Sequence, residues 1–147
     1  MLKIISNSST TTQKVARLFA KELSKEKIRT ARVIALHGNL GAGKTTFIQG
    51  FLRGLGVKSK ITSPTFVILK NYKIKKGNYA KAYHIDCYRI QSSQEILDLG
   101  FKEIISNPGN IVLVEWPERI SAIMPKNATR INFKYGKKEN ERTLQIR

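Results

Sequence analysis

A glycine-rich octapeptide, GNLGAGKT at residues 38–45, constrains the fold of this chain more than any other feature of its sequence. It matches the pattern G-x-x-x-x-G-K-[ST], in which the backbone N–H groups of a tight turn converge on phosphate oxygens. The run RVIALHG that leads into it is apolar and of strand length, and apolar side chains follow it at helical spacing. A strand, this loop and a helix in that order predict a P-loop.

The predicted loop is expected to bind the phosphates of a nucleoside triphosphate. Its glycines lack the Cβ atom that would block a close approach, and the N-terminus of the following helix adds its dipole. Lys44 is predicted to reach the β- and γ-phosphates, and the Thr45 hydroxyl to ligate Mg²⁺. The dinucleotide-binding fingerprint lacks this Lys-Thr pair. The predicted phosphate-binding residues are Gly38, Asn39, Leu40, Gly41, Ala42, Gly43, Lys44, Thr45 and Thr46.

Two carboxylates follow strand-like runs and are candidates for organising Mg²⁺ and the attacking water. Glu115 comes directly after the apolar residues IVLV, where a second buried strand should end, although a glutamate that merely caps a strand is the alternative. In HIDCYR, an extended strand would place His84, Asp86 and Tyr88 on one side. Asp86 is the second candidate for the magnesium shell, whereas His84 alone is more typical of a packed histidine. Cys87 falls on the opposite face and is predicted to be a core residue.

The polar turn TSPTF at residues 62–66 is a candidate segment for sensing the nucleotide. Pro64 biases the residue before it toward an extended backbone. Hydroxyl groups in this turn could contact a γ-phosphate, and an ordinary turn is the alternative. Trp116 is either a core residue or a neighbour of the nucleotide. The candidate switch residues are Ser63, Pro64, Thr65, Phe66, His84, Tyr88 and Arg89.

The first predicted helix precedes the P-loop strand. Residues 2–6 are typical of a short strand, and a helix is expected after Thr10, with Gln13 completing its capping box. The apolar face predicted for this helix consists of Val15, Leu18, Phe19 and Leu23.

Two hairpins and two short helices complete the predicted fold. The hairpins are predicted over residues 65–86 and 128–147. Between them, residues 92–105 suggest one or two short helices, with a Ser92–Glu95 capping box and a break at Gly100. The order of elements implies an α/β fold of the P-loop NTPase class, a small mixed β-sheet flanked by helices. It is expected to form a single P-loop ATPase domain over residues 1–147.

The net charge of the chain is +17, from 27 Lys and Arg residues against 10 Asp and Glu residues. Residues 31–82 contain ten basic and no acidic side chains, whereas residues 83–125 contain six of the acids and three basic side chains. Such a field attracts polyanions such as tRNA, although solvated lysines without a partner are the alternative. A lone cysteine, a polar N-terminus and strand-length apolar runs predict a soluble cytoplasmic protein with no membrane partner.

The motifs GNLGAGKTTF, SPTF, HIDCYR and VEWPER, in this order, resemble those of the TsaE (YjeE) ATPases of bacterial tRNA threonylcarbamoyladenosine (t6A) biosynthesis. The resemblance covers nearly the whole chain. It implies a compact P-loop fold, Mg²⁺ and ATP as cofactors, and weak intrinsic ATP hydrolysis. It also implies a partnership with the TsaB–TsaD heterodimer, which transfers a threonylcarbamoyl group to the adenosine beside the anticodon. ATP hydrolysis would support or reset that complex rather than make the modification itself.

The resemblance also assigns roles to matching residues. Lys44 would hold phosphates, Thr45 and Glu115 would serve the magnesium, and Asp86 would belong to the same acidic site. Residues 63–66 would sense the state of the nucleotide. Asn39 departs from the family pattern, in which many members have aspartate, and this puts a loop-charge role at that position in doubt.

Two other functions are compatible with a P-loop. A small-molecule kinase usually needs an arginine-bearing lid, yet no arginine occurs between Arg89 and Ile111. A basic RNA-binding module with a vestigial nucleotide site is the other alternative, although the intact Lys44 and Glu115 argue against it. Direct contact with tRNA stays a hypothesis. Arg89 and Arg119 are the local candidates for an arginine finger, which stabilises charge in phosphoryl transfer.

Overall fold

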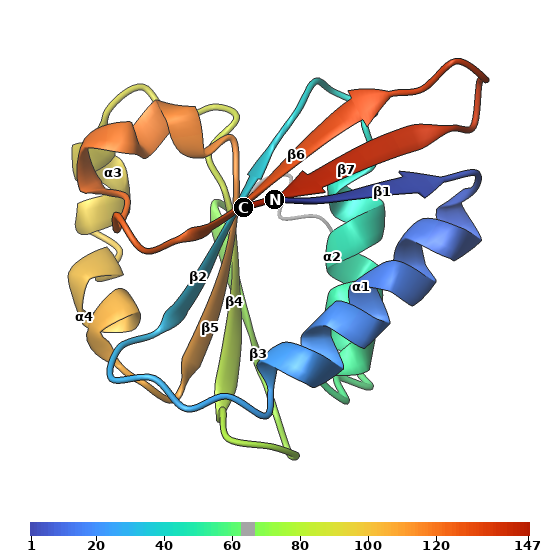
Figure 1. Cartoon of the computed structure of the whole chain (residues 1–147). Helices are drawn as coiled ribbons and strands as arrows, with labels where there is room; N and C mark the ends of the chain where they lie inside the picture. Colours follow the sequence, from blue (N-terminus) through green and yellow to red (C-terminus); the bar gives the residue numbers. More distant parts are fainter. Residues whose placement is uncertain (63–66) are drawn as a thin grey trace.

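The computed structural model describes residues 1–62 and 67–147, which form one mixed β-sheet with helices on both faces (Figure 1). The strand order is β1-β7-β6-β2-β5-β4-β3. The central strand β2 runs parallel to β5 and β6, and β4 runs parallel to β5, whereas the pairs β1–β7, β6–β7 and β3–β4 are antiparallel. The predicted fold class, an α/β fold with a small mixed sheet, is confirmed.

The strands and helices have the following bounds. The strands are β1 (Leu2–Ser6), β2 (Arg32–His37), β3 (Leu69–Lys73), β4 (Lys81–Asp86), β5 (Asn110–Glu115), β6 (Thr129–Tyr135) and β7 (Arg142–Ile146). The helices are α1 (Ser9–Leu23), α2 (Lys44–Gly54), α3 (Ser93–Leu97), α4 (Phe101–Ser106) and the 3-10 helix η1 (Pro117–Ile123). No helix in the described ranges is long and apolar enough to cross a membrane.

The sheet has two buried faces, each covered by its own helices. On one face, Ile34 and Leu36 of β2 pack with α1 and α2. On the other face, Val33 packs with the layer that contains α3, α4 and η1, and Figure 1 shows these two layers on opposite sides of the strands. Every residue of β5 is buried, as expected for a parallel strand that is covered on both sides.

The first helix begins earlier than its sequence pattern predicted. Ser8, not Thr10, is the N-cap, because its backbone is extended and its side chain accepts a hydrogen bond from Thr11 N at 3.1 Å. The predicted capping box is therefore wrong, since Thr10 and Gln13 both lie inside the helix. The predicted apolar face is also partly wrong, because the Leu18 side chain points to solvent.

The part of α1 that faces α2 contains small residues because the two helices approach each other closely. Ala16 and Ala20 of α1 are fully buried. A Cβ atom added at Gly50 of α2 would lie 2.5 Å from the Gln13 carbonyl oxygen, and one added at Gly54 would lie 2.7 Å from the Arg17 carbonyl oxygen. The two backbones therefore pack against each other with no room for a side chain at these glycines.

The remaining predicted elements are present. The two hairpins form as β3–β4 and β6–β7. Helix α3 begins with the predicted capping box, in which Glu95 accepts a hydrogen bond from Ser92 N at 3.1 Å. Gly100 separates α3 from α4 with a φ of 87°, the left-handed conformation that favours glycine.

Candidate nucleotide-binding site

The P-loop connects the carboxyl end of β2 to the N-terminus of α2, as the sequence predicted. The backbone conformation of this loop requires glycine at two positions. A Cβ atom at Gly38 would lie 2.8 Å from the Phe133 carbonyl oxygen, and Gly43, the N-cap of α2, has a φ of 102°. The backbone N–H groups at the start of α2 and the helix dipole make this turn suited to an anion.

Lys44 lies at the centre of the site with its amino group turned back onto the loop. Its Nζ donates hydrogen bonds to the carbonyl oxygens of Gly38 at 2.5 Å and Asn39 at 3.0 Å. The same atom lies 4.4 Å from the centre of the Trp116 ring, within the range of a cation–π contact. Burial lowers the pKa of Lys44, and the nearby carboxylates, Glu115 foremost, oppose that shift.

Glu115 ends β5 beside the P-loop and is held through both carboxylate oxygens. Its Oε1 accepts a hydrogen bond from the Thr45 hydroxyl at 3.3 Å, and its Oε2 lies 2.8 Å from Nε2 of His84. His84 Nδ1 has no hydrogen-bond partner among the described residues. Glu115 is therefore part of a chain of polar groups across three elements.

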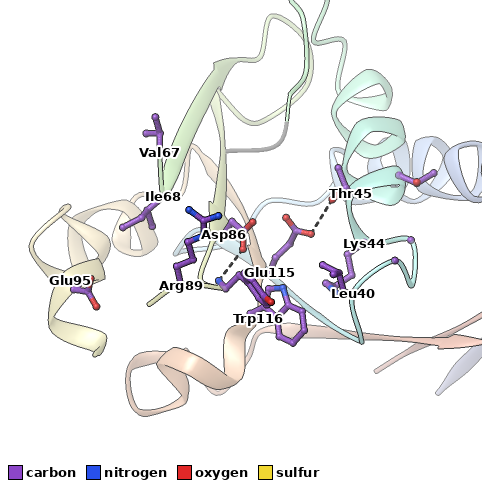
Figure 2. A pocket seen from close by; sticks show the side chains of 14 residues that line it. Leu40, Lys44, Thr45, Val67, Ile68, Asp86, Arg89, Glu95, Glu115 and Trp116 are labelled. Carbon is purple, nitrogen blue, oxygen red and sulfur yellow. Dashed lines mark hydrogen bonds between the residues drawn. The ribbon is translucent and has the colours of Figure 1, made fainter. Parts of the chain in front are cut away.

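Asp86 joins this acidic site because β4 and β5 are paired in register. It lies opposite Glu115 in the parallel ladder, and its Oδ1 accepts a hydrogen bond from Tyr88 N at 3.0 Å. Burial is the main cause that raises the pKa of Asp86, and the neighbouring Glu115 adds to it. Figure 2 shows the Glu115 side chain between Asp86 and Thr45.

Tyr88 lies at the site, but not on the strand face where the sequence predicted it. The prediction that it extends the strand face of His84 and Asp86 is wrong, because β4 ends at Asp86 and the chain turns there. The Tyr88 ring instead packs against Trp116, with 5.1 Å between ring centres. Trp116 has a φ of 56°, and its ring contacts Lys44 and Tyr88. It lies on the wall of the site and also packs against the core, so both suggested positions apply in part.

These side chains, except that of the candidate switch residue His84, line a cavity of about 630 Å³ at the carboxyl edge of the sheet (Figure 2). The predicted site residues on its wall are Leu40, Gly41, Gly43, Lys44, Thr45, Thr46, Asp86, Tyr88, Arg89 and Glu115. Val67, Ile68, Glu95 and Trp116 also contribute to the wall. Sequence patterns signalled Glu95 only as a helix cap, and nothing in the sequence distinguished Val67 and Ile68 from ordinary strand residues.

Three predicted phosphate-binding residues do not line the cavity. Gly38 and Asn39 present their carbonyl oxygens to Lys44 instead, and the Ala42 side chain is buried in the core. Arg119 is exposed and is also absent from the cavity wall. The candidate switch residues Ser63, Pro64, Thr65 and Phe66 lie outside the described residues.

Two further features complete the surroundings of the site. Cys87 is fully buried on the opposite face of the sheet, as predicted, and burial raises the pKa of its thiol to about 12.

On the other side of the P-loop, a small cleft of about 100 Å³ is lined by polar groups that include Ser8, Thr12, Thr46 and Arg142.

The acidic site has the donor set that a magnesium ion requires. The Thr45 hydroxyl, the Glu115 carboxylate and the Asp86 carboxylate are hard oxygen donors on one wall of the cavity. No group of three or more His, Cys, Asp and Glu side chains suited to a metal occurs within residues 1–62 and 67–147. Mg²⁺ usually binds one or two carboxylates, waters and substrate phosphates rather than a complete protein cage, so these residues fit it.

The strand, glycine-rich loop and helix, with an acidic residue at the end of the adjacent parallel strand, define a P-loop NTPase-like α/β fold. The sequence matches the family described as threonylcarbamoyl adenosine biosynthesis protein TsaE over residues 6–144. The chain belongs to the TsaE family.

Individual relatives agree with this assignment. The chain is 40% identical to the tRNA threonylcarbamoyladenosine biosynthesis protein TsaE of Rickettsia prowazekii over 129 residues, which is 87% of this chain and 83% of the relative. It is 41% identical to the TsaE protein of Bacillus subtilis over 102 residues, 69% of this chain and 61% of the relative. The crystal structure of YdiB from Bacillus subtilis superposes with a TM-score of 0.76 at 32% identity, covering 99% of this chain and 83% of YdiB.

Proposed function

We propose that this chain is an ATPase subunit required for the t6A modification of tRNA, which binds Mg-ATP and hydrolyses it slowly. Hydrolysis would support or reset the TsaB–TsaD transferase complex. The observation that carries the proposal is the contact of Thr45 with Glu115, which joins the P-loop to the end of β5 inside one cavity. The names of the relatives, which are tRNA threonylcarbamoyladenosine biosynthesis proteins, support the pathway.

The arrangement of the site suggests where the terminal phosphates of ATP bind. The cavity that holds Asp86 and Glu115 is the place for the terminal phosphates, because Lys44 lies on its wall. The cavity volume of about 630 Å³ leaves room for the phosphates and for water.

Different residues of the chain would bind the phosphates, hold Mg²⁺ and orient the attacking water. Lys44 exchanges its hydrogen bonds to loop carbonyls for hydrogen bonds to phosphate oxygens, which offsets the cost of burying its charge. Thr45 and Glu115 would hold Mg²⁺, which neutralises charge that develops on the transferring phosphoryl group. Asp86 then remains as an acceptor that can orient a water molecule beside the terminal phosphate.

We expect slow hydrolysis by the isolated chain from its resemblance to the TsaE ATPases, and two arginines are local candidates for an arginine finger. Arg89 lines the cavity, whereas Arg119 does not. An arginine that a partner supplies or orders can accelerate P-loop hydrolysis by about 10³–10⁵. We therefore expect a low basal rate that rises with TsaB–TsaD. The kinase alternative gains no support from the described residues, because Ile96 and Phe101 of the helices after β4 are buried against the sheet and do not form a lid.

The test is ATP hydrolysis by the purified protein with Mg²⁺, alone and with TsaB–TsaD, and with small-molecule acceptors in parallel. Glu115→Ala should lower the rate by roughly 10²-fold or more while ATP still binds. Lys44→Ala should weaken ATP binding. The matched control is Glu103→Ala, which removes an exposed carboxylate that does not line the cavity.

Three outcomes would contradict the proposal. Fast turnover by the chain alone argues against a partner-dependent ATPase. Stoichiometric phosphate transfer to an acceptor, without a response to TsaB–TsaD, would identify a kinase. A rate in Glu115→Ala equal to that of the wild-type chain and of Glu103→Ala would remove Glu115 from the mechanism.

A further inference from the structure

The end of the β6–β7 hairpin lies beside the tip of the P-loop. Strand β6 pairs in parallel with β2 up to the partners His37 and Asn132, and it continues to Tyr135, past the point where β2 gives way to the loop. Tyr135 is paired in register with Arg142 of β7. The Tyr135 side chain lies on the same face of β6 as that of Phe133, which packs in the core beside α1 and α2. The Tyr135–Arg142 pair therefore projects toward the loop.

Both side chains of this pair hold carbonyl oxygens at the tip of the loop. The Tyr135 hydroxyl donates a hydrogen bond to the Leu40 carbonyl oxygen. Nη2 of Arg142 donates to the Gly41 carbonyl oxygen at 3.3 Å. The Arg142 guanidinium also lies 4.7 Å from the centre of the Tyr135 ring, as in a cation–π contact.

Arg142 is itself held in place by the turn that joins its strand to β6. Its Nη1 donates to the carbonyl oxygen of Glu139 at 2.7 Å and to that of Glu141 at 2.9 Å. The turn is closed by a hydrogen bond from Gly136 N to Glu141 O at 2.8 Å. The guanidinium that contacts the P-loop is therefore itself held in place by hydrogen bonds to the β6–β7 turn.

Peptide geometry connects these contacts to the phosphate site. A trans peptide places its C=O and its N–H on opposite sides of one plane. When Tyr135 holds the Leu40 carbonyl, the N–H of Gly41 must point away from Tyr135. When Arg142 holds the Gly41 carbonyl, it likewise fixes the N–H of Ala42, which donates to Asn39 O at 3.1 Å. Two successive peptide planes of a glycine-rich turn thus receive a fixed orientation.

We propose that Tyr135 and Arg142 are positioning residues that preorganise the P-loop for phosphate binding by holding the Leu40 and Gly41 carbonyls. The proposal rests on the proposed binding of Mg-ATP at this loop. Glycine-rich backbone has many accessible conformations, and a loop that is fixed before binding loses less entropy when it binds. Tyr135 is 54% exposed, so the core does not require its hydroxyl.

The test compares Tyr135→Phe and Arg142→Lys with the wild-type chain by two measurements. The first is amide hydrogen exchange of residues 38–43 in the nucleotide-free protein. The second is ADP affinity by calorimetry in the presence of Mg²⁺, together with kcat and KM for ATP hydrolysis. Tyr135→Phe keeps the ring beneath Arg142, and Arg142→Lys keeps the charge but not the planar donor group.

The expected result is faster exchange in residues 38–43 and ADP binding weakened about 5- to 10-fold, the effect of one lost hydrogen bond. KM for ATP should rise by more than kcat falls. The matched controls are Tyr79→Phe, whose buried hydroxyl has no partner in the described part of the chain, and Arg29→Lys, which is exposed. Both controls should leave loop exchange and ADP affinity unchanged.

The two proposals fail in different ways. If wild-type protein binds ADP and both loop variants match it in exchange and affinity, Tyr135 and Arg142 do not position the loop. If wild-type protein binds no ADP, the proposed ATPase function fails. The exchange measurement then still decides whether the two side chains hold the loop, because it needs no nucleotide.

Discussion

His84 determines the direction in which Glu115 presents its carboxylate. The histidine is 1% exposed and comes from β4, while Glu115 comes from the neighbouring strand β5. With Oε2 held by His84 and Oε1 by Thr45, the carboxylate has little freedom to rotate. A group that holds a carboxylate in this way acts on the chemistry through the carboxylate and does not touch the substrate.

Substitution of His84 separates this positioning role from simple packing. His84→Gln places an amide nitrogen near the position of Nε2, whereas His84→Asn reaches only the position of Nδ1, which has no partner among the described residues. We expect His84→Asn to lower kcat for ATP hydrolysis roughly 10- to 100-fold, with a smaller change in KM, and His84→Gln to restore part of the loss. Steady-state kinetics of both variants is the measurement. Equal activity of the two variants would show that the hydrogen bond to Glu115 has no such role.

The sequence predicted single residues of this site better than it predicted their contacts. The P-loop residues and Glu115 follow from local patterns, since a strand end and a glycine-rich turn each leave a signature within a few residues. The contact of His84 with Glu115 joins residues 31 positions apart and depends on the register of β4 against β5. Trp116 was left open for the same reason, because its place follows from a left-handed backbone that no pattern signalled.

At the scale of whole elements, the packing of α1 against α2 supports the phosphate site. Helix α2 carries Lys44 and Thr45 on its first turn, so any displacement of its axis moves both. Periodicity of large apolar residues predicted the buried face of α1 only in part, because Leu18 is exposed while Leu23 is buried. The buried contact instead depends on Ala16 and Ala20 opposite Gly50 and Gly54, and glycines on one helix give no signal about the face of another.

Gly50→Ala tests how tightly these helices are packed. Alanine favours a helix over glycine by roughly 1 kcal/mol, but here its Cβ would lie 2.5 Å from the Gln13 carbonyl oxygen and 2.6 Å from Gln13 Cα. Since neither atom belongs to a flexible side chain, the helices must separate. We expect the free energy of unfolding to fall by about 1–3 kcal/mol, as measured by urea denaturation.

The control for this substitution is Gly109→Ala, where the nearest atom is the Asn107 side-chain oxygen at 3.1 Å, which can move. It should change stability by much less. If Gly50→Ala is as stable as the wild-type chain, the close helix contact is not a constraint on this fold.

The whole molecule separates its acidic nucleotide site from its most basic segment. The cavity lies at the carboxyl ends of the parallel strands, and the turn between β3 and β4 lies at the opposite end of the sheet from the start of α2 (Figure 1). At that turn, Lys73 and Lys81 are direct cross-strand partners, an arrangement of like charges that costs stability. The turn also contacts the end of α1, because Asn78 Nδ2 donates to Lys25 O at 3.1 Å.

The hypothesis that tRNA contacts this chain directly is testable at this basic turn. Replacing Lys73, Lys75, Lys76 and Lys81 with glutamine should weaken tRNA binding and reduce the slope of log affinity against log salt by about 3, because each lost phosphate contact reduces counterion release. The control replaces an equal number of exposed lysines elsewhere, namely Lys3, Lys14, Lys102 and Lys126. Filter binding at several salt concentrations compares the two sets at the same net charge. If the two sets have equal effects, tRNA responds only to the overall charge, and if neither has an effect, these lysines do not contact tRNA.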